Sequence, residues 1–422
     1  MHKLPTLKDP NRESRIFQSR VWVSVAFMLV LILVIIVRLA YLQVIEHRHF
    51  TTLSQDNRLK IVPIAPTRGL IYSRDGQILA ENRPSFSLEV VPERVRDFST
   101  SLAEVAKLLD LDNEEIERIT QARLRGRGFD GIVVNTGMNE QDVALFSVNR
   151  HRFPGFNIVA RLARHYPFGD RMAHVIGYVG RINESELKVL DVKGYRGTTH
   201  VGKVGVEKSR EDVLHGTVGS QQVEVNAQGR VLRVVTQSLP IPGNDIYLTL
   251  DVGLQQVAID ALADHSGAIV ALEPSTGEVL AFVSQPAFDP NLFVNGISKD
   301  SYKALRESTA RPLFNRALQA QYPPGSTVKP MVALAGLESG VRHAGDHTWC
   351  PGWYTLDGGD HKYRDWFKRG HGQVDLGRSI AESCDVYYYS LARDLGIAKL
   401  HGMFSQFGLG RATGIDLPGE TS

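Results

Sequence analysis

The most informative part of the sequence begins with the stretch Tyr322-Pro323-Pro324-Gly325-Ser326-Thr327-Val328-Lys329-Pro330. Its leading prolines and glycine end any preceding element, and an apolar run, 331–337, follows at once. This pattern predicts a turn that leads into a helix, with Ser326 in or next to the first helical turn. Pro330 is tolerated there because first-turn amides have no intrahelical partner. Since the run is apolar nearly all round, we expect a buried, central helix.

Ser326 and Lys329 are expected to share one face of that helix, because residues three apart are neighbours on a helical surface. Partial desolvation in an apolar setting favours the neutral form of a lysine, so its amine can take a proton from serine. The helix N-terminus adds positive potential where an oxyanion forms. The pair therefore predicts a serine acyltransferase, although the bare Ser-x-x-Lys spacing also occurs on surface helices without any chemistry.

A second element, Ser383-Cys384-Asp385, follows downstream. Ser-x-x-Lys together with a Ser-Asp-Asn type element is typical of penicillin-binding proteins and class A β-lactamases. On these residues, and on the pedestal-type stretches 66–80, 164–180 and 202–207, the chain resembles the class B penicillin-binding proteins. Within that family it is most similar to the penicillin-binding protein 2 group, the elongation-specific peptidoglycan D,D-transpeptidases.

The resemblance implies an α+β fold with one N-terminal transmembrane helix. An elongated, mostly β pedestal with a small helical head would follow, and then a transpeptidase-like domain whose antiparallel sheet has helices on both faces. The expected boundaries are a cytoplasmic tail at 1–20, a transmembrane signal anchor at 21–43, a dimerisation-type pedestal at 44–243 with its head at about 84–160, and a transpeptidase domain at 244–422.

Local patterns add detail to this plan. Residues 66–80 are typical of a strand, an Asp-Gly turn and a second strand. Capping-box patterns at Ser101 and Asp112, each with glutamate three positions later, predict two helix starts. The elements predicted ahead of the serine helix are a strand at 245–251, a helix ending at Leu262, and a hairpin of 267–273 with 277–284.

The resemblance also implies the roles of the site residues. Ser326 is expected to be the nucleophile and Lys329 its general base, while Ser383 relays the proton toward the leaving amine. Asp385 stands where many relatives have asparagine, and aspartate there is common in the penicillin-binding protein 2 group. The implied substrates are peptidoglycan stem peptides ending in D-Ala-D-Ala, and β-lactams would acylate the same serine. The implied partners are a SEDS-family glycan polymerase and the elongation machinery.

A third family element, K-T-G or K-S-G on a strand beside the site, is not found in the sequence. Lys203-Val204-Gly205 and Lys368-Arg369-Gly370 both lack the hydroxyl residue. We therefore expect the transpeptidase domain to be incomplete at its C-terminus, without the strand that holds the substrate carboxylate.

The only two cysteines, Cys350 and Cys384, flank a segment rich in His, Asp and Gly. With Asp365 and His371 they could form a closed tetrahedral site of the structural kind, and the resemblance to some penicillin-binding proteins 2 favours one zinc ion there. The alternatives are a Cys350–Cys384 disulfide, as an oxidising compartment permits, or two unlinked cysteines. Substitute ligands close in sequence are Asp346, His347, Asp360 and His361.

An uncharged, almost wholly apolar run, 21–37, is followed by Arg38 and a further apolar segment, 39–42. This length predicts a membrane span, and it disfavours a buried core helix or a cleavable signal peptide. Basic residues are concentrated before the run, which places residues 1–20 in the cytoplasm. The chain is thus expected to be a single-pass protein of the bacterial inner membrane, with its bulk in the periplasm.

The composition is that of a globular protein, with 43% hydrophobic and 22% charged residues, and excludes wholesale disorder. A net charge of +2 gives no reason to expect nucleic acid as a partner, and a helix-turn-helix reader at 100–125 is disfavoured because that segment lies outside the cytoplasm. Two rival functions remain: a β-lactam sensor or resistance enzyme, and a non-catalytic regulator of the SEDS-family polymerase.

Overall fold

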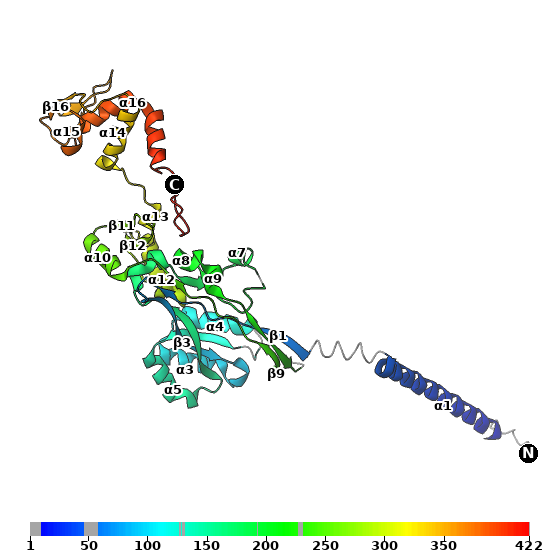
Figure 1. Ribbon diagram of the computed structural model, residues 1–422. Coiled ribbons are helices and arrows are strands. Elements are labelled where there is room, and N and C mark those ends of the chain that lie inside the picture. The colour runs from blue at the N-terminus through cyan, green and yellow to red at the C-terminus, as the bar shows by residue number, and fades with distance from the viewer. Residues whose placement is uncertain are drawn as a thin grey trace, which may run out of the picture. The chain divides into compact units, whose positions relative to one another are not determined.

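The computed structural model describes residues 10–45, 58–125, 128, 131–191, 193–226 and 231–421 (Figure 1). The chain divides into two compact units. The first unit comprises Met1–Pro66, Asp191–Thr198 and Thr217–Ile241, and the second comprises Thr67–Leu190, Thr199–Gly216 and Pro242–Ser422. The predicted α+β class is confirmed, because the strands pair mainly antiparallel and helices pack beside them.

The first unit contains the long helix α1 (Pro10–Ala40), which continues as a short π-helical turn (Tyr41–Ile45). The segment Arg15–Gln43 has a mean hydropathy of 2.9 in its most apolar window, and none of that window is buried. A core helix of a soluble domain would be covered by other elements, so the exposure disfavours that alternative. Length and composition are those of a helix that can span a bilayer once.

The first unit also contains a three-stranded antiparallel sheet in the order β1-β8-β9, with bounds Leu59–Ile64, Gly219–Val225 and Val231–Ser238. β1 pairs with β8 from Leu59 opposite Glu224 to Ile64 opposite Gly219. The sheet therefore joins segments that are more than 150 residues apart in sequence.

The second unit is built on a five-stranded sheet in the order β10-β2-β3-β4, with β5 paired to β3. The strand bounds are Ile246–Tyr247 for β10, Ile71–Tyr72 for β2, Ile78–Val90 for β3, Ile132–Met138 for β4 and Phe156–His165 for β5. The predicted strand, turn and strand of 66–80 correspond to β2, the Asp75-Gly76 turn and the start of β3. Gly76 there has a φ of 81°, which favours glycine.

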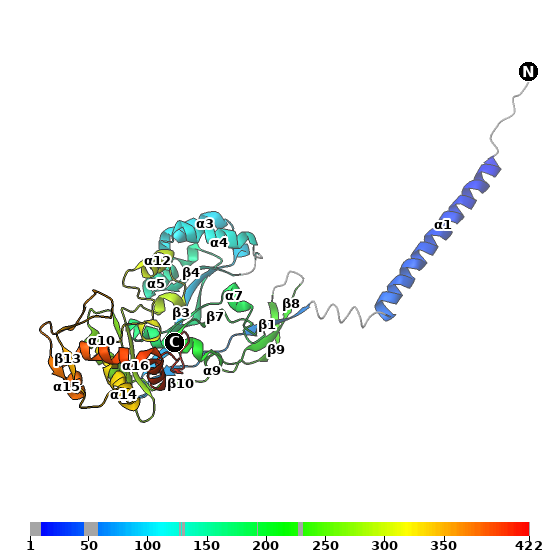
Figure 2. The same cartoon turned by 90° about the horizontal axis from the view of Figure 1, so that it is seen from above.

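Three helices, α3 (Phe98–Leu109), α4 (Asn113–Arg125) and α5 (Glu140–Asn149), cluster beside β3 and β4 (Figures 1 and 2). Their apolar faces share one core with the sheet, which includes Leu88, Val105, Ile119 and Phe146. The predicted capping box at Asp112 is confirmed: its side chain accepts from the Glu115 amide at 2.7 Å, and Glu115 accepts from the Asp112 amide at 3.3 Å.

The predicted helix start at Ser101 is wrong. α3 begins three residues earlier, where Asp97 accepts a hydrogen bond from the Thr100 amide at 3.2 Å, so Ser101 lies inside the helix. Asp97 is a strong N-cap residue, and a capping pattern within the first turn can be mistaken for the cap itself. The predicted strand 245–251 is also too long, since only Ile246–Tyr247 pairs, with β2.

A buried ion cluster connects three distant segments of the second unit. Glu207, fully buried on α8 (Gly205–Ser209), accepts from Arg68 Nε and from Arg164 Nε, each at 2.7 Å. Tyr166 Oη donates to the same carboxylate at 3.2 Å and accepts from the Val179 amide at 2.9 Å. Burial raises the pKa of Glu207, but the two guanidinium groups outweigh it and hold that pKa below its ordinary value.

The other short elements of this unit are α6 (Ala173–Ile176), α7 (Glu184–Leu187), α9 (Glu211–His215), and the paired strands β6 (Val179–Arg181) and β7 (His200–Gly202). 3-10 turns occur at Pro92–Arg94, Arg150–Arg152 and Gly169–Met172. The predicted helix ending at Leu262 is α10 (Val252–Leu262), and the predicted hairpin is β11 (Gly267–Leu272) with β12 (Val279–Gln285). After them come α11 (Asn291–Val294), α12 (Lys299–Glu307) and α13 (Arg316–Gln319).

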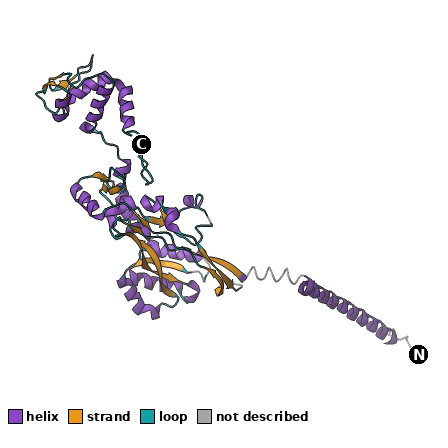
Figure 3. Cartoon of the chain, in the orientation of Figure 1, coloured by secondary structure: helices purple, strands orange, loops and turns teal. Residues whose placement is uncertain are grey.

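The C-terminal lobe, residues 325–408, consists mainly of helices with short strands (Figure 3). Its helices are α14 (Lys329–Glu338), α15 (Leu376–Ala381) and α16 (Asp385–Gln406), the last interrupted at Gly396. Its strands form two pairs, β13 (Thr348–Cys350) with β16 (Gly372–Val374) and β14 (Trp353–Tyr354) with β15 (Tyr363–Arg364). α14 and α16 pack against each other around Val332, Tyr387 and Leu391.

His174 on α6 makes the stability of this unit depend on pH. Its imidazole is buried and meets the Phe288 ring edge-on, with the ring centroids 5.3 Å apart. Burial lowers the pKa of His174 to about 4. The unfolded state, in which a histidine has its ordinary pKa near 6.5, therefore binds the proton more tightly than the folded state. The contribution of His174 to the free energy of unfolding is fully present above pH 6.5 and falls by about 3 kcal/mol as the pH is lowered toward 4.

We expect His174→Gln to remove much of this acid sensitivity, because glutamine does not titrate. The measurement is the thermal unfolding midpoint between pH 7.5 and pH 4.5 for the parent, His174→Gln, and the exposed control His265→Gln. The midpoint should fall less on acidification in His174→Gln than in the parent and the control. An identical pH dependence in all three proteins would contradict the assignment.

Candidate functional site

The predicted turn and helix at the serine are found in the structure. Gly325–Val328 form a 3-10 turn, with Gly325 at a φ of 58°, and α14 starts at Lys329. Ser326 is exposed, whereas Lys329 is 8% exposed. The helix is buried on the side of Val332 and Ala335, but Leu337 is 39% exposed. The expected all-round burial of the helix is therefore only partly observed in this chain.

The second predicted element is the turn between α15 and α16. Its backbone is held by hydrogen bonds from the Ser383 amide to Ile380 O at 3.2 Å and from the Cys384 amide to Ser379 O at 3.0 Å. Ser383 has a φ of 51°, in the left-handed region, which residues with a Cβ rarely adopt. This turn brings the Ser383 hydroxyl to 3.0 Å from the Ser326 hydroxyl.

Lys329 connects the two elements. Its ammonium Nζ lies 2.8 Å from Ser383 O, 3.1 Å from Ser383 Oγ and 2.6 Å from Asp385 Oδ1. All four predicted residues are thus brought together. The sequence-based expectation of a direct Lys329–Ser326 contact differs from the structure, in which the Ser383 hydroxyl stands between the lysine and Ser326.

Four side chains predicted as metal ligands form one buried cluster. Cys350 comes from β13, Asp365 follows β15, His371 precedes β16 and Cys384 precedes α16. Their potential ligand atoms all lie within 4.8 Å of one another. Both thiols are unlinked. The substitutes Asp346, His347, Asp360 and His361 are exposed and do not belong to this cluster.

The electrostatics of this cluster are unfavourable for bare thiolates. Burial, together with the neighbouring Cys350 thiol, raises the pKa of Cys384 well above its ordinary value. Burial also raises the pKa of Asp365, but hydrogen bonds from the Phe367 and Val386 amides outweigh it, so that pKa lies below its ordinary value. The Cys384 thiol therefore keeps its proton beside the Asp365 carboxylate unless a cation takes the place of that proton.

Two neighbours of the cluster were missed by sequence reasoning. His371 Nδ1 faces Cys350 Sγ at 3.6 Å, while its Nε2 lies 3.9 Å from Glu382 Oε2. That oxygen is buried and has no hydrogen-bond partner among the described residues. Trp366 forms two hydrogen bonds here: its backbone amide donates to Asp385 Oδ2 at 3.3 Å, and its indole N–H donates to Glu382 O at 3.0 Å. One signal in the sequence pointed to Glu382 and Trp366, because each is adjacent to a predicted site residue, Ser383 and Asp365 respectively.

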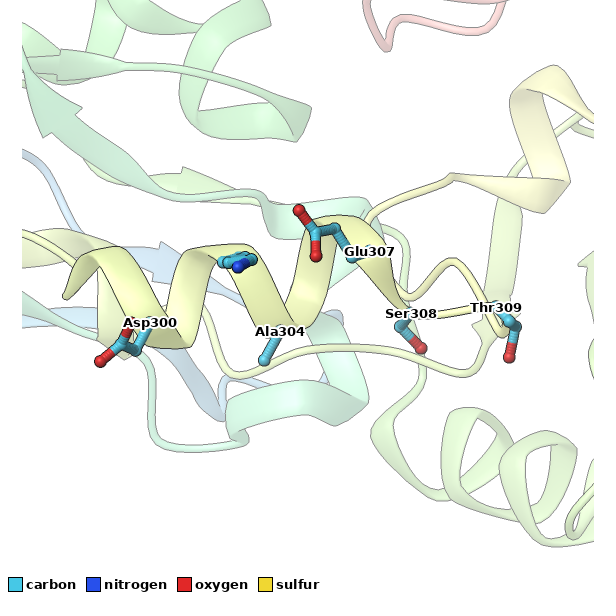
Figure 4. Close-up of a pocket in the computed structure, with 6 residues that line it drawn as sticks. Asp300, Ala304, Glu307, Ser308 and Thr309 are labelled. Carbon is cyan, nitrogen blue, oxygen red and sulfur yellow. The ribbon is translucent and has the colours of Figure 1, made fainter.

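Two surface pockets lie elsewhere in the chain. One of about 510 Å³ runs along α12 and is lined by Asp300, Lys303, Ala304, Glu307, Ser308 and Thr309 (Figure 4). Another, of about 550 Å³, is lined mainly by apolar residues such as Val206, Leu250 and Phe282, with Arg210 and Asp416 among its polar residues. Neither contains any of the eight predicted site residues.

Comparison with known proteins gives two family matches. Residues 63–248 match the penicillin-binding protein dimerisation domain, and residues 267–422 match the penicillin-binding protein transpeptidase domain. Among curated proteins, the chain is 44% identical over 415 residues to peptidoglycan D,D-transpeptidase MrdA of Acinetobacter baumannii, covering 98% of this chain and 62% of that protein. MrdA of Salmonella typhimurium is 39% identical over 424 residues, covering 98% of this chain and 67% of that protein.

Solved structures give the same result. PBP2 of Pseudomonas aeruginosa, in complex with WCK 5153, aligns with a TM-score of 0.60 at 41% identity, covering 86% of this chain and 60% of that one. PBP2 of Helicobacter pylori, in complex with MreC, aligns with a TM-score of 0.72 at 31% identity, covering 86% and 68%. The chain spans less than two thirds of the length of several of its relatives, 62% and 66% for two MrdA proteins.

Proposed function

The chain belongs to the penicillin-binding protein family, in the penicillin-binding protein 2 (MrdA) group, and on that premise we propose that it is a peptidoglycan D,D-transpeptidase. It cross-links stem peptides during cell elongation and is acylated by β-lactams. The observation that carries the proposal is the chain of hydrogen bonds that runs from Lys329 through Ser383 to Ser326. Because the chain spans only part of its relatives, its activity, substrate and partners are all included in the proposal.

In the first step, Ser326 Oγ attacks the carbonyl carbon of the penultimate D-alanine of a stem peptide. The C–N bond to the last D-alanine breaks, and D-alanine leaves with a proton on its amine. The acyl group stays on Ser326 as an ester. In a β-lactam the same attack opens the ring, and the leaving nitrogen stays attached to the acyl group. A covalent nucleophile divides one difficult acyl transfer into two easier steps.

The proton of Ser326 has a path through Ser383, because the hydroxyl groups lie 3.0 Å apart and Lys329 Nζ lies 3.1 Å from Ser383 Oγ. Lys329 can accept that proton only as a neutral amine. Its Nζ also lies 2.6 Å from Asp385 Oδ1, which holds the lysine beside Ser383. In the second step, the amine of a neighbouring stem peptide attacks the ester, and Ser326 recovers its proton by the reverse path.

We expect penicillin to form its adduct on Ser326. The test uses this chain and a version extended at its C-terminus to the length of the relatives, with mass spectrometry of the labelled peptides. Ser326→Ala should reduce labelling to background in both, and the extended version should react much faster, because the family's third motif is not found in this chain. Undiminished labelling of Ser326→Ala would contradict the assignment, and equal rates would show that the extension is dispensable.

We also propose that Cys350, Asp365, His371 and Cys384 hold one structural zinc ion. Cysteine sulfur, imidazole nitrogen and carboxylate oxygen are all zinc ligands, and four of them can complete the tetrahedral coordination of a closed zinc site. The fit extends to the surroundings, since a metal-bound histidine usually has a carboxylate at its other nitrogen. Glu382 Oε2 lies 3.9 Å from His371 Nε2 and has no hydrogen-bond partner within the described part of the chain. When bound, zinc replaces the thiol protons and joins the β13–β16 segments to the start of α16.

Elemental analysis of protein purified without chelator should find about one zinc per chain. His371→Ala should lose the zinc and lower the thermal midpoint by roughly 5 °C or more. His361→Ala, which changes an exposed histidine of the same lobe, should keep both. Protein without zinc, in which the denatured, unreduced chain has no titratable thiol, would instead establish the disulfide alternative.

The partners follow from the same premise. The Helicobacter relative is described in complex with MreC, and we propose that this chain likewise binds a component of the elongation machinery and a SEDS-family glycan polymerase. The SEDS partner is supported only by family resemblance. Co-purification with and without residues 60–240 would distinguish binding by that region from binding by the catalytic part.

The orientation in the membrane completes the proposal. Residues 1–20 carry five basic side chains, whereas the far end of the apolar helix carries Arg38 and Arg48. The positive-inside rule then places the N-terminus in the cytoplasm and the two family-matched domains in the periplasm of the inner membrane.

Alkaline phosphatase, which is active only after export, should therefore be active when fused after Leu262. A cytoplasmic reporter at the same position should be inactive, and a fusion of each reporter after Arg20 provides the opposite control. Active cytoplasmic reporter and inactive phosphatase after Leu262 would reverse the orientation.

A further inference from the structure

Ser383 has an unusual backbone for a residue whose hydroxyl must be accurately placed. Its φ of 51° is in the left-handed region, where the Cβ of an L-residue is crowded by its own backbone. Such a conformation persists only where surrounding contacts hold it. The origin of those contacts therefore decides how firmly the Ser383 hydroxyl is kept near Ser326.

The chain after Ser383 is held by a carboxylate from a distant segment. Asp365 Oδ2 accepts hydrogen bonds from the amides of Asp385 at 2.9 Å and Val386 at 3.2 Å, the first two residues of α16. α16 has no side-chain cap of its own, because Cys384 stands at the N-cap position. An anion at the N-terminus of a helix satisfies free amides and interacts favourably with the helix dipole.

The chain before Ser383 is held by the next residue of the same segment. The Trp366 indole N–H donates to Glu382 O at 3.0 Å, and the Trp366 amide donates to Asp385 Oδ2 at 3.3 Å. Asp365 is itself anchored, since its amide donates to Gly352 O at 2.9 Å and its Oδ1 accepts from the Phe367 amide at 3.0 Å. The consecutive residues Asp365 and Trp366 thus form hydrogen bonds to the turn 382–386 on both sides of Ser383.

We propose that Asp365 and Trp366 form a positioning clamp, which holds Ser383 in its left-handed conformation with the hydroxyl within hydrogen-bonding distance of Ser326. The inference rests on the proposed acyl transfer through Ser326 and Ser383. Both clamp residues act through the backbone and the Asp385 side chain. The Trp366 half of the clamp is separate from the proposed zinc site, because Trp366 offers no ligand atom, whereas Asp365 belongs to both.

The Trp366 half of the clamp is tested with Trp366→Phe in the extended chain, since phenylalanine keeps an aromatic side chain but has no N–H donor. Acylation by a fluorescent penicillin is followed over a range of concentrations, which separates the dissociation constant of the initial complex from the acylation rate constant. We expect the rate constant to fall about fivefold, as for one lost hydrogen bond, with the dissociation constant within about twofold. Zinc content and the thermal midpoint should not change.

The matched control is Trp349→Phe, at a 63% exposed tryptophan on β13, which should leave both constants unchanged. An unchanged rate constant in Trp366→Phe would overturn the clamp. So would a lower thermal midpoint with both constants changed alike, because that is the effect of a merely structural residue.

The Asp365 half is tested by comparing Asp365→Ala with His371→Ala. Both remove a proposed zinc ligand, but only the first removes the side-chain oxygen that accepts from the α16 amides. The acylation rate constant should be at least about fivefold lower in Asp365→Ala than in His371→Ala. Equal rate constants would overturn the role of Asp365, which would then act only through the metal. A parent chain that is not acylated at Ser326 would instead overturn the proposed function itself, and the purpose of the clamp with it.

Discussion

The buried carboxylate of Glu207 is the constraint on which the second unit depends. It is fully buried, and it accepts from two guanidinium groups and one tyrosine that come from two other segments, around Arg68 and at 164–166. Removing one partner of such a buried pair typically costs about 3–5 kcal/mol, because the remaining charge is left without compensation. The sequence stretches that resemble family motifs, around Arg68, Arg164 and Glu207, are therefore parts of one interaction rather than independent signals.

Asp365 has a comparable place in the C-terminal lobe, with different partners. It is 3% exposed and accepts from backbone amides, and both cysteine sulfurs lie within 3.6 Å of its Oδ2. Since amides cannot move independently of the chain, this carboxylate determines the backbone path around Ser383. Glu207 selects which segments meet, whereas Asp365 orients the first turn of a helix next to the reacting hydroxyls. A buried carboxylate thus joins distant segments in one place and fixes a local backbone turn in the other.

Much of the local structure could be predicted from the sequence, because the signals are themselves local. The turn before Lys329, the Asp75-Gly76 hairpin and the capping box at Asp112 all depend on residues within a few positions. The helix start at Ser101 was wrong since two capping patterns overlap and Asp97 is the actual cap. Residues 245–251 pair only at 246–247, because the length of a strand depends on the neighbour available to it.

The candidate site was accessible to sequence reasoning only where residue types are distinctive. Two cysteines in a chain of 422 residues attract attention, and so does serine three before lysine. The left-handed backbone of Ser383 gives no signal, because a serine there resembles any other serine. The contacts of Asp365 and Trp366 with the α16 turn join residues about 20 positions apart, and the strands that bring them together are only two or three residues long.

The spacing of the Glu207 cluster has a consequence for biosynthesis. Arg68 and Glu207 are separated by 139 positions, and Arg164 precedes Glu207 by 43. Because a chain is synthesised from its N-terminus, Arg68 and Arg164 are both made before the glutamate that they share. The strand pairs β2–β3 and β3–β5 consist of residues that precede Glu207, so they can pair before the ion cluster that joins them to α8 is complete. The glutamate is therefore the last member of the cluster to be synthesised.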